Sequence, residues 1–352
     1  MSKSNDFSAI PILDLSLAKT GKLDQLLDEL RHALLYVGFF YVKNHSIPQS
    51  LLDRSKDLAV KFFDSPQEVK DKYDKIFSPS FLGYSKQGFE TTKGKKDNRE
   101  QFDFADGNSI EPSPENPEYF KLYAPFKYPS DEDVEGFEST YKQLLVGYKK
   151  LSTELTELIA LSLGLPADTF EKYFEKNHQN RAKVVKYPSV SELESNDGDQ
   201  GVGPHKDSAC LLALLYQAND VPGLQVQNHS GEWIDASPIP GTIVINIGSV
   251  LETLTSGLAV ATTHRVLNSP AGRGPRYSIP YFISVRRDEP VGALDIPGDY
   301  SHLKDRTVIS DNDDKYKELF FNNLGKGSHP DVGYKYYPEL AAEIGITADT
   351  KF

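Results

Sequence analysis

The chain has 352 residues and a formal net charge of −12 at pH 7, enough length for one large domain or two smaller ones. Its longest basic patch is Lys93-Gly94-Lys95-Lys96, which argues against a nucleic-acid partner because neutralising phosphates needs clustered Lys and Arg. A single cysteine, Cys210, excludes an intrachain disulfide framework and favours a reducing compartment. The start of the chain lacks the apolar core of a secretory signal, and the longest apolar run, 209–216, is far shorter than the ~20 residues of a membrane span. We therefore expect a cytosolic protein.

The first part of the chain predicts an alternation of short strands and amphipathic helices. Residues 10–15 form an apolar opening strand, and leucines at helical spacing between Leu23 and Leu34 predict a helix. A second strand is expected at 38–42 and a second helix at 48–63. The sequence Ser65-Pro66-Gln67-Glu68 has the pattern of a capping box, so a further short helix should begin there.

The rest of the chain separates into a loop-rich stretch, one long helix and a β-rich half. Residues 77–128 have no sustained period and predict mostly loop with short strands, whereas apolar residues from Phe137 to Leu158 recur every three or four positions. The acidic, glycine-rich stretch 192–203 predicts a mobile loop. Short runs rich in Val, Ile, Tyr and Phe then predict strands at 182–187, 210–217, 223–228, 241–247, 263–268 and 276–285.

These elements indicate a mainly β protein with a supporting helical region, closed as a sandwich or barrel. We divide it into an N-terminal mixed α/β region at 1–128, a supporting long helix at 129–180 and a β core at 181–290. Residues 291–352 form a C-terminal extension with a helix near 314–324.

Two histidines and one aspartate form the most informative motif. His205-x-Asp207 would place two ligands on one face of a strand through period-two alternation, and His264 lies in a second predicted strand that a closed sheet can bring opposite the first. About one His-x-acid pair is expected by chance in this composition, and His329-Pro330-Asp331 also matches. No histidine follows that second pair, so we interpret it as a C-terminal surface turn. Two imidazoles and one carboxylate can occupy one face of an octahedron around Fe(II), leaving positions open for other ligands.

A second motif suits a carboxylate ligand. Arg276 and Ser278 share a strand face by alternation, and a guanidinium fork beside a hydroxyl can hold a carboxylate through charge-assisted hydrogen bonds. A surface strand with a salt bridge is the alternative for this pair taken alone.

Taken in order, these residues resemble the 2-oxoglutarate- and Fe(II)-dependent oxygenases of the isopenicillin N synthase-like branch. The resemblance extends over nearly the whole chain. It is carried by residues 10–15, 38–45, Lys186-Tyr187-Pro188, His205-x-Asp207, Gly223-Leu224-Gln225-Val226, Asn246-Ile247-Gly248, His264-Arg265-Val266 and Arg276-x-Ser278.

The resemblance implies a double-stranded β-helix, or jelly roll, in which His205, Asp207 and His264 bind Fe(II). It also implies that 2-oxoglutarate chelates the iron and that its far carboxylate meets Arg276, Ser278 and the phenol of Tyr187. O2 then converts 2-oxoglutarate to succinate and CO2 while a small organic substrate is hydroxylated, desaturated or cyclised. By strand phase, Leu214, Val266 and Phe282 are expected to line the substrate pocket.

Two other functions remain open at this point. Relatives that need no 2-oxoglutarate also carry the Arg-x-Ser motif, so the chain could be an oxidase that grips its own substrate with Arg276 and Ser278. A non-catalytic binding protein on the same scaffold is the alternative from another class. Substrate identity and oligomeric state have no readable code in the sequence.

Several other residues have a structural and a functional interpretation. Asn98, Arg99, Gln101, Phe102 and Phe104 lie where relatives place some substrate contacts, or they form an exposed strand. We interpret Cys210 as a small buried apolar residue and His45 as a residue that caps or packs. Trp233, the only tryptophan, is expected to pack between strands.

Overall fold

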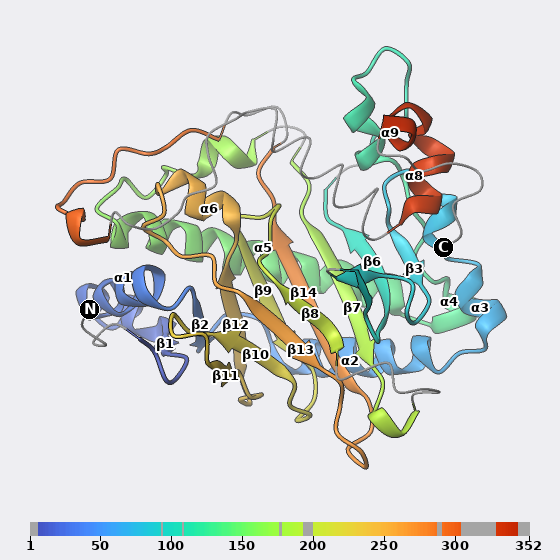
Figure 1. The fold of residues 1–352 in the computed structure, drawn as a ribbon, viewed down its shortest axis with the longest axis horizontal. Coiled ribbons are helices and arrows are strands. Elements are labelled where there is room, and N and C mark those ends of the chain that lie inside the picture. Colours follow the sequence, from blue (N-terminus) through green and yellow to red (C-terminus); the bar gives the residue numbers. More distant parts are fainter. Residues whose placement is uncertain are drawn as a thin grey trace.

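The computed structural model describes residues 6–92, 94–107, 109–175, 178–192, 200–286, 291–303 and 329–343. Its largest element is an eight-stranded sheet that combines strands from both halves of the chain (Figure 1). In spatial order the strands are β1 (Ile12–Asp14), β2 (Phe39–Lys43), β12 (Thr242–Ile247), β9 (Leu212–Gln217), β14 (Arg276–Ile283), β7 (Arg181–Tyr187), β6 (Glu100–Ala105) and β3 (Gly83–Ser85).

A four-stranded sheet lies over the centre of the large one (Figure 1). Its order is β11 (Trp233–Asp235), β10 (Leu224–Gln227), β13 (His264–Leu267) and β8 (Gln200–His205), with antiparallel pairing throughout. Between the sheets lies an apolar cluster that includes Val185, Val226, Val244 and Val266. Two facing sheets with inward alternating side chains confirm the predicted jelly-roll core. A separate hairpin pairs β4 (Thr91–Thr92) with β5 (Lys95–Lys96).

Three long helices cover the other face of the large sheet. They are α1 (Leu23–Tyr36), α2 (Gln49–Phe63) and α5 (Phe137–Ser162), and their buried faces share one cluster with alternate residues of the sheet, among them Leu214 and Ile245. The leucines and tyrosines predicted to form one face of α5 are buried. They belong to the largest apolar cluster, so the main hydrophobic core lies between the helices and the large sheet and not between the two sheets. Shorter helices are α3 (Gln67–Asp71), α4 (Asp131–Val134), α6 (Ser249–Leu254), α8 (Pro330–Tyr336) and α9 (Pro338–Glu343).

The predicted long elements are present, and two local predictions were wrong. Helix α3 begins after Pro66 without a side-chain cap, because the Ser65 hydroxyl donates instead to the Lys61 carbonyl at 2.9 Å. The end of the predicted 192–203 loop is strand β8, so the glycine-rich stretch before His205 is part of the small sheet. The helix predicted near 314–324 lies outside the described residues.

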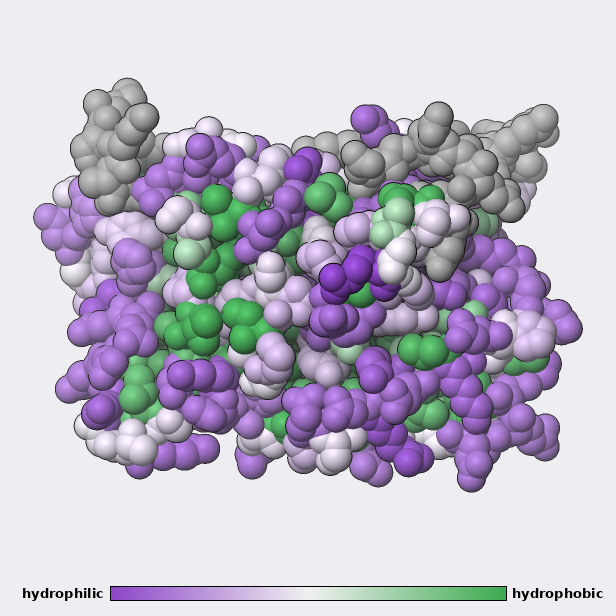
Figure 2. Space-filling view, turned by 90° about the horizontal axis from the view of Figure 1, so that it is seen from below, coloured by the Kyte–Doolittle hydropathy of each residue, from purple (hydrophilic) through white to green (hydrophobic). Residues whose placement is uncertain are grey.

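The surface is largely hydrophilic, with apolar residues in small groups on the face seen in Figure 2. Large apolar side chains that are exposed lie far apart in the chain, for example Phe77, Val146 and Tyr334. Among the described residues, no helix combines the length and apolar character needed to cross a bilayer.

Candidate metal and carboxylate site

The small sheet brings the two histidines directly together. His205 is the last residue of β8 and pairs with His264, the first residue of β13, so their rings lie 4.2 Å apart between centroids. Asp207 follows in the connection to β9, and its Oδ1 lies 3.6 Å from His205 Nε2 and 3.9 Å from His264 Nε2. One ligand atom from each residue falls within 4.8 Å of the others. The histidines are thus neighbours across one pair of opposite strands, as the sequence suggested, whereas Asp207 lies beyond the end of β8 and not on the same strand face as His205.

Backbone carbonyls determine which ring nitrogen of each histidine faces the aspartate. His205 Nδ1 lies 2.8 Å from the Gly203 carbonyl, and His264 Nδ1 lies 3.2 Å from the Thr262 carbonyl. A carbonyl only accepts hydrogen bonds, so both Nδ1 atoms carry the proton in the neutral ring. Each Nε2 therefore keeps its lone pair for a metal ion.

Asp207 is oriented by residues to which the sequence analysis assigned no role. Asn246 on β12 donates from Nδ2 to Asp207 Oδ2 at 2.8 Å, which leaves Oδ1 toward the histidines. The Ser249 amide at the start of α6 donates to the Asp207 carbonyl at 2.8 Å. An asparagine within the apolar run of β12 was the available signal, because a buried polar side chain requires a partner.

Electrostatics favour a cation among these three side chains. Burial raises the pKa of Asp207, but His264, His205 and Asn246 outweigh it and hold the carboxyl pKa below its ordinary value. Burial, followed by the neighbouring His205, lowers the pKa of His264 to about 4. At neutral pH His264 is therefore neutral and Asp207 is ionised, which are the protonation states that metal ligation requires.

Arg276 is a buried cation without a matching anion. It is 1 % exposed, and its Nη2 donates to Gln217 Oε1 at 2.9 Å. Within the part of the chain that the structure describes, Arg276 forms no ion pair, and its Nε and Nη1 have no hydrogen-bond partner. A buried charge of this kind is costly unless a ligand of opposite charge pairs with it. The alternative of a surface strand with a salt bridge is excluded, because Arg276 is buried and forms no ion pair among the described residues.

The two residues predicted to assist Arg276 lie beside it. Tyr187 on β7 pairs with Arg276 across the large sheet, and its ring centroid lies 5.2 Å from the guanidinium carbon. Ser278 is 2 % exposed and lies two residues along β14. Arg276 and Ser278 share one strand face, as the alternation predicted, and Tyr187 lies beside Arg276 on the neighbouring strand.

The predicted lining residues divide between the space between the two sheets and the core under the helices. Val266 lies in the cluster between the sheets, and Phe282 pairs with Ala213 on the inner face and is partly exposed. Leu214, Phe102 and Phe104 instead belong to the cluster under the helices. The prediction that they contact substrate was therefore wrong. The chain between Asp207 and Leu212 is irregular, which breaks the alternation used to assign Leu214. All of β6 is buried, so the alternative of an exposed strand is also wrong.

The second His-x-acid pair is not a surface turn. His329 is 2 % exposed, and its Nε2 lies 2.7 Å from Lys75 Nζ and 2.9 Å from Glu90 Oε1. It precedes α8 and connects the C-terminal helices to the N-terminal region. The local sequence could not reveal this, because both partners lie more than two hundred residues earlier in the chain.

The other residues that the sequence left aside have structural positions. Cys210 is buried, as predicted, and burial raises the pKa of its thiol well above the ordinary value. His45 follows β2 and is half-buried, at a distance from the metal motif in the fold. Trp233 lies on β11, where the Arg265 guanidinium carbon stands 4.0 Å over its ring centroid.

Family comparisons agree with this geometry. The family described as "non-haem dioxygenase in morphine synthesis N-terminal" matches residues 10–131, and the "2OG-Fe(II) oxygenase superfamily" matches residues 177–285. The chain belongs to the 2OG-Fe(II) oxygenase superfamily. It is a 2-oxoglutarate-dependent dioxygenase, an oxidoreductase whose cofactors are Fe(II) and 2-oxoglutarate.

Individual relatives of this oxygenase cover almost its whole length. A 2-oxoglutarate-dependent dioxygenase, frbJ, of Dothideomycetidae sp. (strain 11243) is 42% identical over 96% of this chain and 95% of the relative. A homoarginine-6-hydroxylase of Oryza sativa subsp. japonica is 36% identical over 82% of this chain and 89% of its own. A solved 2OG-Fe(II) oxygenase family protein from Caulobacter crescentus has a TM-score of 0.72 and 26% identity, covering 89% of this chain and 99% of that one.

We predict that the metal-free oxygenase loses stability as the pH falls from 6.5 toward 4. His264 stays neutral in the folded state down to a pKa of about 4, against 6.5 ordinarily, so in this window the unfolded chain binds more protons. The difference corresponds to at most about 3 kcal/mol. Denaturant unfolding with a chelator present, at several pH values, should give a shallower pH dependence for His264→Gln. Equal slopes in both proteins would contradict this assignment.

Proposed function

We propose that His205, Asp207 and His264 hold Fe(II), and that Arg276, Ser278 and Tyr187 bind the carboxylate of 2-oxoglutarate that lies away from the metal. The observation that carries this proposal is the convergence of two Nε2 atoms and one carboxylate oxygen within 4.8 Å, together with a buried guanidinium on the large sheet that has no ion pair among the described residues. Bound there, Fe(II) and 2-oxoglutarate would supply the O2-dependent oxidation of a C–H bond, with succinate and CO2 as co-products.

The chain's own residues contribute orientation and exclusion of water. The Gly203 and Thr262 carbonyls hold the imidazole protons on Nδ1, while Asn246 occupies one oxygen of Asp207. Phe39 packs against His264 with 5.1 Å between ring centroids, and the apolar cluster between the sheets lies behind it. An apolar environment that excludes water strengthens electrostatic interactions at the site and limits side reactions.

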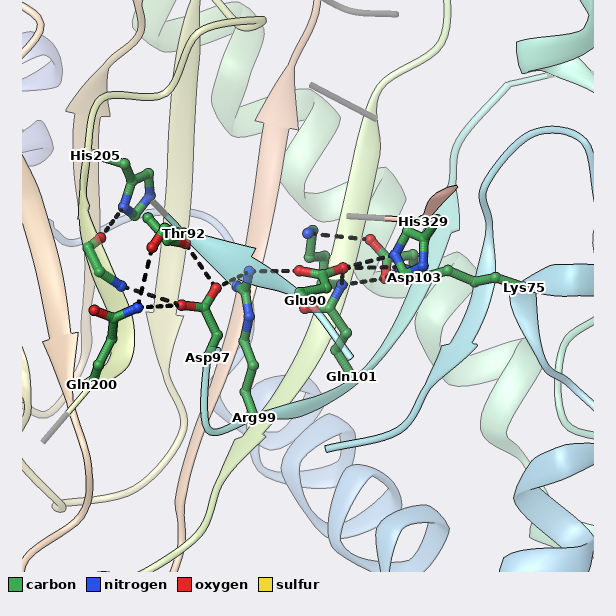
Figure 3. Close-up of polar contacts among 12 residues, drawn as sticks. Lys75, Glu90, Thr92, Asp97, Arg99, Gln101, Asp103, Gln200, His205 and His329 are labelled. Carbon is green, nitrogen blue, oxygen red and sulfur yellow. Dashed lines mark hydrogen bonds and ion pairs between the residues drawn. The ribbon is translucent and has the colours of Figure 1, made fainter. Parts of the chain in front are cut away.

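The polar face of β6 supports a small polar substrate. Gln101 and Asp103 on β6 are buried on the face opposite Phe102 and Phe104, and Lys183 of β7 reaches Asp103 with 3.4 Å between Nζ and Oδ1. Figure 3 shows Gln101 and Asp103 in a row of polar residues that runs from His205 to His329. We propose a small, polar, amino-acid-like metabolite as substrate, in keeping with the homoarginine hydroxylase relative. Phe282 remains our candidate for an apolar contact in the same pocket.

We further propose a cytosolic role in secondary metabolism without a nucleic-acid or membrane partner. The fungal relative at 42% identity supports the metabolic role. The net charge of −12 and the single cysteine support the cytosolic assignment.

The metal assignment is tested by anaerobic addition of Fe(II) and 2-oxoglutarate. We expect the visible charge-transfer band of the iron–keto acid chelate in the wild-type protein and its loss in Asp207→Ala, which removes an anionic ligand. Asp220→Ala, at a carboxylate whose side chain is 90% exposed, serves as the control and should keep the band. A wild-type protein that binds iron but stays colourless with 2-oxoglutarate would refute the proposed chelate.

Arg276→Ala should weaken 2-oxoglutarate binding while leaving Fe(II) affinity nearly unchanged. Loss of charge-assisted hydrogen bonds of about 1.5–3 kcal/mol corresponds to roughly 10- to 100-fold in the 2-oxoglutarate Kd. Arg273→Ala, at an exposed arginine paired with Asp220, is the matched control. Titrations of each cofactor check this, and equal losses of iron and 2-oxoglutarate affinity in Arg276→Ala would contradict the separation of roles.

Succinate formation across a substrate panel tests the proposed substrate class. Amino acids, including homoarginine, should stimulate 2-oxoglutarate turnover more than apolar aromatic acids of similar size, because the β6–β7 wall is charged. Stimulation by the apolar compounds alone would reverse this conclusion.

A further inference from the structure

The strand that ends in His205 lies at the edge of its sheet. β8 is the last strand of the four-stranded sheet, and its only strand partner in that sheet is β13. That pairing is irregular, with register shifts between His264 and Leu267. An edge strand with one interrupted ladder leaves part of its backbone without strand partners. The position of His205 therefore depends on what contacts the other edge of β8.

The hairpin β4–β5 and the residues after it cover that edge. The Asn98 amide donates to the Gln200 carbonyl at 3.1 Å, and Gln200 Nε2 donates to Asp97 Oδ1 at 3.0 Å. Asp97 Oδ1 also accepts from the Gly203 amide at 3.4 Å. Because the Gly203 carbonyl accepts from His205 Nδ1, one glycine connects Asp97 to the imidazole (Figure 3).

Asp97 is itself held by a buried set of charges. Its side chain is 0% exposed, and its Oδ2 accepts from the Thr92 hydroxyl at 2.8 Å and from Arg99 Nη2 at 3.2 Å. Arg99 also pairs with Glu90, whose backbone carbonyl accepts from the Asp97 amide at 2.9 Å. A buried carboxylate with this many donors has one well-defined orientation.

The same set of charges continues away from the iron ligands. Glu90 contacts Lys75 and His329, and Lys75 Nζ lies 2.7 Å from Asp103 Oδ2. Gln101 bridges the two acids by donating to both Glu90 and Asp103. Figure 3 shows the row running from His205 to His329. Asp103 is thus a buried carboxylate in the same network, at the end opposite β8.

We propose that Asp97 is a positioning residue for the iron ligand His205. Its carboxylate holds the free edge of β8 so that the Gly203 carbonyl meets His205 Nδ1 and Nε2 faces Asp207. This inference rests on the proposed role of His205 as a ligand. It assigns to the segment before β6 a part in metal binding that is separate from any contact with substrate.

Asp97→Ala should raise the Kd for Fe(II) about tenfold, the lower end of the effect of residues that support metal ligands through hydrogen bonds. Asp97→Asn should raise the Kd for Fe(II) less, because the amide oxygen can still accept hydrogen bonds from Gly203 and Gln200. Asp103→Ala is the matched control: it also removes a buried carboxylate from the network but should leave the Fe(II) Kd unchanged. Anaerobic Fe(II) titration measures all four proteins, alongside thermal unfolding.

Hydrogen exchange in the metal-free proteins gives a readout that does not involve iron. The Gly203 amide should exchange faster in Asp97→Ala than in Asp103→Ala, even where both unfold at lower temperature than the wild type. Equal Fe(II) affinity in wild type and Asp97→Ala would overturn the positioning role, as would equal losses in Asp97→Ala and Asp103→Ala. Failure of the wild-type protein to bind Fe(II) would instead overturn the proposed function.

Discussion

The pairing of β8 with β13 is the constraint on which the candidate site depends. It makes His205 and His264 neighbours at one end of this strand pair, and the backbone then brings Asp207 to the same point before it enters the large sheet. Strand pairing alone places these two residues of the triad side by side, so their approach does not depend on side-chain conformation. The carbonyls that hold each Nδ1 belong to residues just before the histidines, so orientation is also local.

The sequence predicted those parts of the fold whose signals are local. The helices α1, α2 and α5 follow from leucine and tyrosine spacing, and the triad and Arg276 follow from residue chemistry in strand context. Strand β8 was missed because Gln200–His205 contains two glycines and a proline and little apolar alternation. In β6 the alternation of Phe102 and Phe104 with Gln101 and Asp103 was visible, but the pattern alone does not say which face meets the helices. In the structure Phe102 and Phe104 face the helices, and the buried side chains of Gln101 and Asp103 lie on the opposite face of the strand.

Two buried arginines illustrate how charge balance separates scaffold from ligand site. Arg99 pairs with Glu90 and Asp97, so its charge is matched by the protein itself. Arg276 contacts the neutral side chains of Gln217 and Tyr187 and forms no ion pair among the described residues. The Arg99 side chain is 15% exposed and Arg276 is 1% exposed, so the more deeply buried guanidinium is the one that lacks an ion pair. The unmatched charge is therefore the better indicator of where an anion binds.

The order of strands in the large sheet has a consequence for synthesis. β2 pairs with β12, and β6 pairs with β7, so strands from the first third of the chain have neighbours near residues 245 and 185. The central strands β12 and β14 come last along the sequence. A nascent chain emerging from the ribosome can form α1, α2 and α5, but its earliest strands must wait for β14 before the sheet closes. High contact order of this kind slows folding and leaves strand edges open meanwhile, which makes the growing polypeptide a natural client for chaperones.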